Sequence, residues 1–146
     1  MATTPRVPSR PLALVLLAVY LVLAALIAFW PTPVDAGAAP LLTTLIAKLH
    51  AYGMPTWLGY DQFEFAANVL FFTPLGALLT LLLGRDRWWF AVLIALGASV
   101  CIELAQQEFL AARFSSIADV AANGLGALIG ALLAAWAMGH RTTRSR

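Results

Sequence analysis

Four long apolar segments leave this chain little choice of fold. They cover residues 12–30, 63–83, 88–108 and 117–138, and each is close to the roughly 20 residues that a helix needs to cross a hydrocarbon core of about 30 Å. Only 11% of the residues are charged and 62% are apolar, whereas a soluble domain carries about 25% charged residues. The sequence therefore predicts an all-α integral membrane protein with four transmembrane helices.

The first apolar segment has a second interpretation, because Arg6 and Arg10 precede it as basic residues precede a secretory signal. Val34 and Ala36 are also small enough to flank a cleavage site. However, the stretch from 12 to 30 exceeds the roughly 7–15 apolar residues of a signal core. We therefore expect an uncleaved anchor, and its loss would leave the other three helices unchanged.

The basic residues predict the orientation of the four spans. If both termini are cytoplasmic, Lys48 and Arg113 are the only two of the nine Lys and Arg residues on the outer side. Cytoplasmic loops carry an excess of such residues, so this arrangement agrees with the positive-inside rule. Since the basic residues form no continuous face, we expect no nucleic-acid partner despite the net charge of +2.

The long connection between the first two spans contains a second kind of helix. Its apolar residues recur at helical spacing, namely Leu41, Leu42, Leu45, Ile46, Leu49 and Tyr52. We expect a short amphipathic helix lying in the outer interface. The chain then divides into an anchor with its outer loop (1–60), a membrane domain (61–139) and a basic cytoplasmic tail (140–146).

Carboxylates and side-chain amides gather at the outer ends of the last three spans. They are Asp61, Glu64, Asn68, Glu103, Gln106, Gln107, Glu108, Asp119 and Asn123. Spacings of three and four residues place several of them, with Ser99, on shared helix faces. Such groups cost a few kcal/mol each in hydrocarbon, and a set of them at one depth usually marks a function. The sequence thus predicts a shallow polar pocket on the extracytoplasmic side.

Some of these residues also have structural interpretations. Asp61 and Ser116 fit helix N-caps, and Ser116 with Asp119 fits a capping box. Asn68 and Asn123 fit hydrogen bonds between helices. For Glu103, Arg113 and Asp119 we favour a functional role, because a carboxylate below the membrane surface needs a proton or a partner. Arg113 is either that partner or a receptor for an anionic headgroup.

Small residues predict where the helices approach closely. Gly126 and Gly130 form a GxxxG motif, and Ala122, Ala127, Ala131 and Ala134 extend its surface. Pro74 lies inside the second span, where it frees a backbone carbonyl. Since four short spans bury little surface, the sequence also allows a homo-oligomer through Gly126 and Gly130.

Three sequence blocks resemble the VanZ-like family, small bacterial membrane proteins named for a member associated with teicoplanin resistance. The blocks are NVLFFTPLG (68–76), SVCIELAQ (99–106) and RFSSIADVAANGLGALIG (113–130), and the resemblance covers roughly residues 61–136. It implies a multi-pass protein of the bacterial cytoplasmic (inner) membrane, a cell-envelope role and reduced sensitivity to glycopeptide antibiotics. The family's recurring polar positions map onto Asn68, Ser99, Glu103, Gln106, Arg113, Asp119 and Asn123.

Two classes of function remain open. The first is a non-catalytic protein whose outer pocket binds a lipid headgroup, a lipid-linked wall precursor or an amphiphilic glycopeptide. The second is a small membrane hydrolase or transferase acting on a lipid-linked substrate, with Glu103 and Asp119 as acid and base or as cation ligands. We favour the first, because no His lies in any span and the sequence holds no phosphate-binding glycine loop or zinc spacing. Accordingly, we expect no cofactor and no metal.

Overall fold

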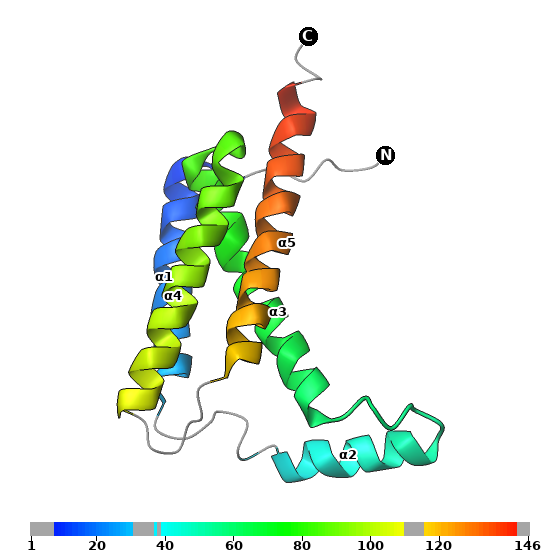
Figure 1. The fold of residues 1–146 in the computed structure, drawn as a ribbon. Helices are drawn as coiled ribbons and strands as arrows, with labels where there is room; N and C mark the ends of the chain where they lie inside the picture. The colour runs from blue at the N-terminus through cyan, green and yellow to red at the C-terminus, as the bar shows by residue number, and fades with distance from the viewer. Residues whose placement is uncertain (1–7, 31–36, 38, 110–115, 143–146) are drawn as a thin grey trace.

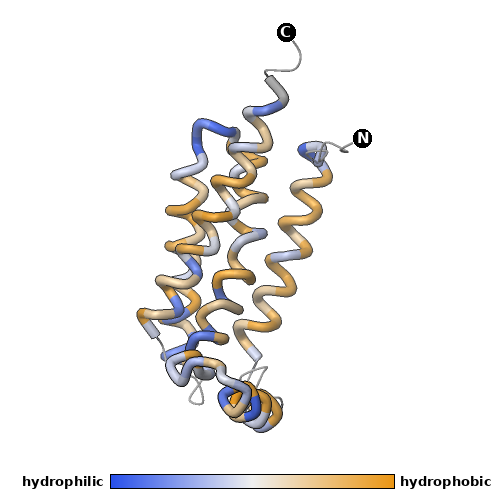
Figure 2. The backbone as a smooth tube through the Cα atoms, turned by 90° about the vertical axis from the view of Figure 1, so that its right-hand side faces the viewer, coloured by the Kyte–Doolittle hydropathy of each residue, from blue (hydrophilic) through white to orange (hydrophobic). Residues whose placement is uncertain are grey.

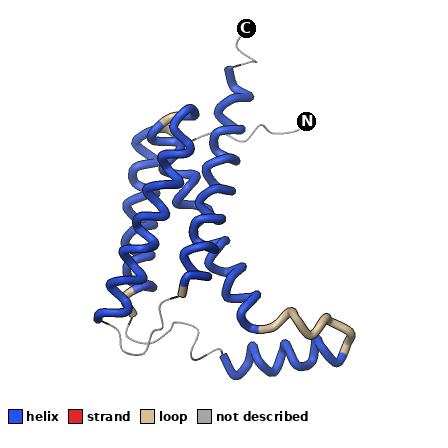
Figure 3. The backbone as a smooth tube through the Cα atoms, in the orientation of Figure 1, coloured by secondary structure: helices blue, strands red, loops and turns tan. Residues whose placement is uncertain are grey.

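The described part of the chain is helical throughout its length apart from short connections. The computed structural model describes residues 8–30, 37, 39–109 and 116–142, and within these ranges there is no strand. The helices are α1 (Arg10–Ala28), α2 (Ala39–Ala51), α3 (Tyr60–Leu83), the short 3-10 helix η1 (Arg85–Arg87), α4 (Trp88–Phe109) and α5 (Ile117–Thr142). Figure 3 shows the same elements along the chain.

Four of these helices are long and apolar enough to cross a membrane, namely α1, α3, α4 with η1, and α5. The prediction of an all-α membrane protein with four spans is therefore confirmed. In Figure 2 the apolar colour runs along all four helices, while hydrophilic residues gather near the two ends of the bundle.

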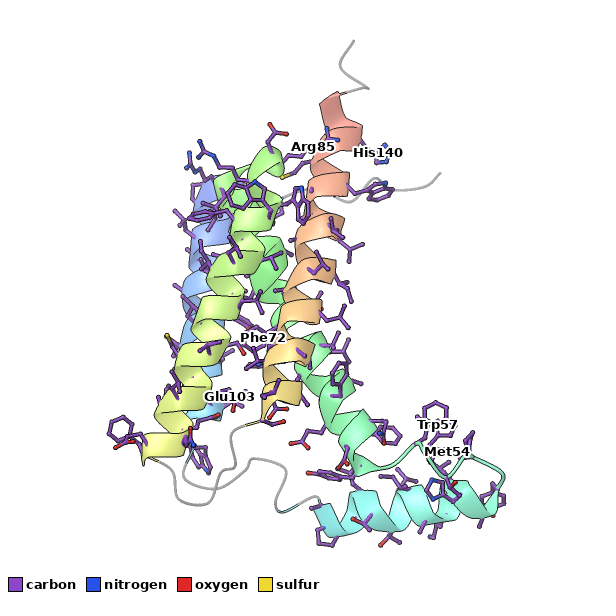
Figure 4. The ribbon with its side chains drawn as sticks, in the orientation of Figure 1. Met54, Trp57, Phe72, Arg85, Glu103 and His140 are labelled. Carbon is purple, nitrogen blue, oxygen red and sulfur yellow. The ribbon has the colours of Figure 1, made fainter. Side chains whose placement is uncertain are left out.

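The predicted helix of the outer loop also exists, as α2. It lies across the end of the bundle where α1 ends and α3 begins, which we call the α2 end (Figure 1). The start of α1 and the end of α5 lie at the opposite end. The exposed side chains of α2 include Leu41 and Leu45, and Tyr52, directly after its end, is also exposed. Exposed apolar side chains are expected for a helix that lies in a membrane interface. In Figure 4, Trp57 and Met54 project from the connection between α2 and α3 toward the level of the spans.

The tightest packing in the structure joins α3 to α5. Gly126 and Gly130 lie against the backbone of α3 at Val69 and Thr73, and Gly76 of α3 lies in the same way against Ala127. A methyl group at any of these glycines would collide with backbone atoms. The GxxxG motif is thus a packing surface, as predicted, but it is occupied by α3 of the same chain. A homo-oligomer stays a prediction, and it would need a different surface.

The core is built from small and large apolar residues around this contact. Phe72, Leu75, Ala95 and Ala127 form its buried cluster, with partly buried residues of α1 packed against it. By contrast, α1 is exposed along most of its length. The hydroxyl of Tyr20, in α1, donates to the carbonyl oxygen of Phe71 in α3 at 3.0 Å. This bond ties α1 to α3 one residue after Leu70, whose carbonyl lacks its helical donor because Pro74 has no N–H.

The start of α3 corrects one prediction. Gly59, not Asp61, is the N-cap residue of α3, and Asp61 lies in the first helical turn. The Gly59 N–H donates to Oε1 of Gln62 at 2.8 Å. Because Gln62 accepts the N–H of the cap residue, glycine can serve as the N-cap although it has no side chain. Asp61 is not needed as a cap, and its side chain is exposed.

Candidate functional site

Polar side chains from three helices meet near the α2 end of the bundle. Asn68 comes from α3, Ser99 and Glu103 from α4, and Asp119 and Asn123 from α5. We call these five residues the three-helix polar cluster. Ser99, Glu103 and Asn123 are buried, while Asn68 and Asp119 are half-buried. Arg113, which belongs to the predicted site, lies outside the described residues.

The helical geometry explains why Glu103 and Asn123 lie at a similar depth. Glu103 lies six residues before the end of α4, and Asn123 six residues after the start of α5. At a rise of 1.5 Å per residue, both are about 9 Å from the helix end. Figure 4 shows Glu103 on the lower part of α4, close to where α5 begins. The prediction that polar groups of different helices lie at similar depth thus agrees with the structure.

The first pair of the cluster joins α3 to α5. The amide nitrogen Nδ2 of Asn68 donates to Oδ1 of Asp119 at 2.7 Å. A hydrogen bond from an amide to a carboxylate is stronger than one between neutral groups. Asn68 therefore orients the Asp119 carboxylate, and the predicted hydrogen bond from Asn68 to another helix is confirmed.

The second pair lies one helical turn deeper and joins α4 to α5. Nδ2 of Asn123 donates to the hydroxyl oxygen of Ser99 at 2.9 Å. Ser99 is fully buried, and Asn123 is 7% exposed. The other polar atom of the amide, Oδ1 of Asn123, is buried without a hydrogen-bond partner among the described residues. A buried acceptor of this kind is uncommon and asks for an explanation.

Glu103 is bound to the start of α5. Its Oε2 accepts the backbone N–H of Ser116 at 3.1 Å. Ser116 in turn accepts the N–H of Ala118 through its hydroxyl oxygen at 3.1 Å. Ser116 therefore acts as a cap, as predicted. The reciprocal half of the expected capping box is not made by Asp119, because Glu103 takes the Ser116 N–H and Asp119 accepts from Asn68.

Gln106 has a different role from the one its position suggested. Its Nε2 donates to the carbonyl oxygen of Ala28 at 2.8 Å. Ala28 is the last residue of α1, where carbonyl groups lack helical partners. Gln106 thus ties the end of α1 to α4. Sequence reasoning could not find this contact, because it joins residues far apart in the chain.

The remaining candidates lie at the surface. Asp61, Glu64, Gln107 and Glu108 are exposed. In the parts of the chain that the structure describes, no three His, Cys, Asp or Glu side chains come together as metal ligands would. The two histidines lie elsewhere: Nε2 of His50 is 3.0 Å from the carbonyl oxygen of Leu58, and His140 packs against Trp136 near the end of α5.

Comparison with known proteins supports the resemblance noted above. A family model described as VanZ/LLP1 matches residues 17–138. The match is longer than the expected region of 61–136, because it includes most of α1 and all of α2. No curated protein and no solved structure matches the chain.

Proposed function

The chain belongs to the VanZ/LLP1 family, and from that premise we propose that it is a multi-pass protein of the bacterial cytoplasmic membrane that binds the headgroup of an envelope lipid or a lipid-linked wall precursor. The proposed binding site is the three-helix polar cluster, with Arg113 reading an anionic group of the ligand. Membership of the family also suggests an effect on glycopeptide sensitivity. A lipid or wall precursor bound to this protein would be less accessible to an amphiphilic antibiotic at the membrane surface.

The observation that carries this proposal is the unequal matching of donors and acceptors in the cluster. A cluster that served packing alone would satisfy its own polar atoms, since an unsatisfied group in hydrocarbon costs several kcal/mol. Here Oδ1 of Asn123 is left without a partner among the described residues. Among the described residues, the two carboxylates of the cluster each accept one hydrogen bond, Asp119 from the Asn68 amide and Glu103 from the Ser116 N–H. A bound polar group supplies what the cluster lacks.

The position of the cluster suits a headgroup better than a deeply buried substrate. Its members lie within about 3–15 Å of the helix ends at a rise of 1.5 Å per residue. In Figure 1, α3 leans away from α5 toward its own N-terminus, and α2 lies across this end. If α2 rests in the outer interface, the cluster is at the depth that lipid headgroups and their first carbons occupy.

The enzyme alternative has no comparable support. Catalysis by Glu103 and Asp119 as an acid and base pair requires each carboxylate to reach a reacting atom. Each accepts a hydrogen bond that orients it, from the Asn68 amide or the Ser116 N–H, and neither bond comes from a group that would relay a proton. Neither described histidine lies beside them. The binding function is therefore the one that the geometry favours.

Lipid retention tests the proposal. The full chain is extracted in mild detergent, and its bound lipids are identified by native mass spectrometry for wild type, Glu103→Gln and Asp119→Asn. Both substitutions keep an oxygen that accepts the existing hydrogen bond and remove the charge. Glu108→Gln is the matched control, because Glu108 is exposed in the last turn of α4. We expect a retained lipid in wild type and the control, and its loss in the two cluster variants. Equal retention in all four proteins would refute the proposal.

A further inference from the structure

The three-helix polar cluster offers hydrogen-bond acceptors in excess of donors. Oε2 of Glu103 accepts one backbone N–H, and Oδ1 of Asp119 accepts one amide N–H. An ionised carboxylate accepts at about four lone-pair positions and donates none. Asn68 and Asn123 each use one amide N–H, on Asp119 and Ser99. The second N–H of each amide and the Ser99 hydroxyl are fewer than the acceptor positions left on the two carboxylates and on Oδ1 of Asn123. The group that completes this site must therefore bring donors.

Asn123 is an independent sign of the same need. Its Nδ2 is held toward α4 by Ser99, and its Oδ1 is buried without a partner in the described part of the chain. Asn123 lies four residues after Asp119, and Ser99 lies four residues before Glu103. Thus the Asn123 amide lies one turn below the Asp119 carboxylate on α5, and the Ser99 hydroxyl lies one turn below the Glu103 carboxylate on α4, each on the same helix face as its carboxylate. The unpartnered oxygen is therefore carried by the residue one helical turn below Asp119, on the α5 face that also contacts Ser99 of α4.

Charge narrows the chemistry of the missing group. The start of α5 compensates part of the negative charge, because a helix N-terminus acts like roughly +0.5 of an elementary charge. Among the described residues, two ionised carboxylates exceed this by more than one unit. A water molecule would satisfy Oδ1 of Asn123 but would leave that excess in a region of low dielectric. A cation that also donates hydrogen bonds meets both requirements.

We infer that the three-helix polar cluster binds a primary ammonium group, held by Glu103, Asp119 and the free oxygen of Asn123. This inference rests on the proposed function and specifies the ligand class of the same site. A primary ammonium has three N–H donors, which equals the number of acceptor side chains. Aminophospholipids carry this group on a phosphate at the membrane surface. A quaternary ammonium has the same charge but no N–H, and a glycerol headgroup has donors but no positive charge.

Three lipids with the same acyl chains separate these properties. The full chain is placed in nanodiscs containing equal amounts of phosphatidylethanolamine, phosphatidylcholine and phosphatidylglycerol, and the lipids that remain bound on mild release are quantified by native mass spectrometry. We expect phosphatidylethanolamine to be enriched roughly tenfold over both others, the ratio that corresponds to one lost hydrogen bond to a charged group. Glu103→Gln and Asp119→Asn should abolish the enrichment, while Glu108→Gln should retain it.

A second arm identifies the source of the ammonium. Free phosphoethanolamine that displaces the retained lipid at millimolar concentration indicates that a ligand from solution can supply the group. Retention that withstands this competition indicates a lipid source. Either result supports the ammonium site, provided that the enrichment depends on Glu103 and Asp119. A melting curve of each variant establishes that the loss of binding is not a loss of fold.

The outcomes that overturn the inference are distinct from failure of the proposed function. Equal retention of phosphatidylethanolamine and phosphatidylcholine, or preference for phosphatidylglycerol, removes the ammonium site; if that retention still depends on Glu103, the headgroup function stands. Enrichment of phosphatidylethanolamine that appears in Arg113→Gln but not in wild type would show that Arg113 occupies the acceptors, and it also overturns the inference. Retention independent of Glu103 and Asp119 refutes both proposals.

Discussion

The contact between α3 and α5 makes a quantitative prediction about a single methyl group. In Gly130→Ala the new Cβ would lie 2.8 Å from the carbonyl carbon of Thr73 and 2.9 Å from the backbone nitrogen of Ala77, and closer still to the Thr73 oxygen. Ordinary contacts of a Cβ begin at 3.4 Å. Because the colliding atoms belong to the backbone, no rotamer change removes the overlap. The two helices must separate.

The cost of this separation follows from general packing energetics. A gap of about 0.5–1 Å forfeits a quarter to a half of the contact energy of the atoms that line it, and overpacking in a tight core typically costs about 1–3 kcal/mol. Replacing Gly by Ala within a helix also gains about 0.5–1 kcal/mol from backbone entropy. That gain must be cancelled before the clash can be measured.

Gly97→Ala is the reference variant, because it has the same gain in backbone entropy without a clash. Gly97 is inside α4, and a Cβ there would meet nothing within 4 Å. We expect Gly97→Ala to be neutral or about 0.5–1 kcal/mol more stable than wild type, and Gly130→Ala to be about 1–3 kcal/mol less stable than Gly97→Ala. The free energy of unfolding is measured in mixed micelles by SDS titration, followed by ellipticity. Equal stability of the two variants would refute the account of the α3 and α5 contact.

Two further predictions concern α1 and the orientation of the spans. Tyr20→Phe removes a hydrogen bond between α1 and α3 and should lower the free energy of unfolding by about 0.6–2 kcal/mol in the same titration, as such bonds contribute in membranes. Tyr52→Phe is the control, because Tyr52 is 89% exposed, and it should leave the free energy of unfolding unchanged. Equal effects of the two substitutions would contradict the assigned contact. The orientation is tested by cysteine labelling in a Cys101→Ala background. A membrane-impermeant thiol reagent added to intact cells should label Thr56→Cys but not Asp86→Cys, because the positive-inside rule places the α2 end outside. The reverse labelling pattern would show that the predicted orientation is wrong.

The sequence predicted the elements of the fold more accurately than their contacts. The expected spans of 12–30, 63–83, 88–108 and 117–138 differ by a few residues at most from the observed helices. Length and apolar composition are local properties, and the thickness of the bilayer converts them directly into helices. The same holds for the GxxxG surface, since small residues at this spacing permit close approach whichever helix is the partner.

The pairing of polar residues could not be predicted in this way. The sequence assigned Asp119 to a capping box and Gln106 to the site, but Asp119 accepts from Asn68 and Gln106 donates to Ala28. Each pairing depends on which helices become neighbours and on their rotation about the axis, and neither is a property of one segment. The choice of Gly59 over Asp61 as the cap of α3 depends likewise on the direction from which the preceding loop arrives.

Under the proposed function, the buried polar groups have two roles. The pairs Asn68 with Asp119 and Asn123 with Ser99 join three helices on two successive turns of α5, where interhelical hydrogen bonds favour one arrangement of the bundle. The atoms that these pairs leave over are those that the proposed ligand needs. The same substitutions can thus affect stability and binding, and charge-removing isosteres such as Glu103→Gln separate the two effects.

Site-specific photo-crosslinking tests the central claim most directly, because it locates the ligand. A photoreactive amino acid is introduced at the exposed position Ala118, beside the cluster, or at Leu133, which is 57% exposed farther along the same helix. Cells are irradiated, and the adducts are identified by mass spectrometry. The account predicts one dominant adduct carrying a headgroup at position 118, absent in the Glu103→Gln background, and only nonselective lipid adducts at position 133. Identical adducts at both positions, unchanged by Glu103→Gln, would contradict it.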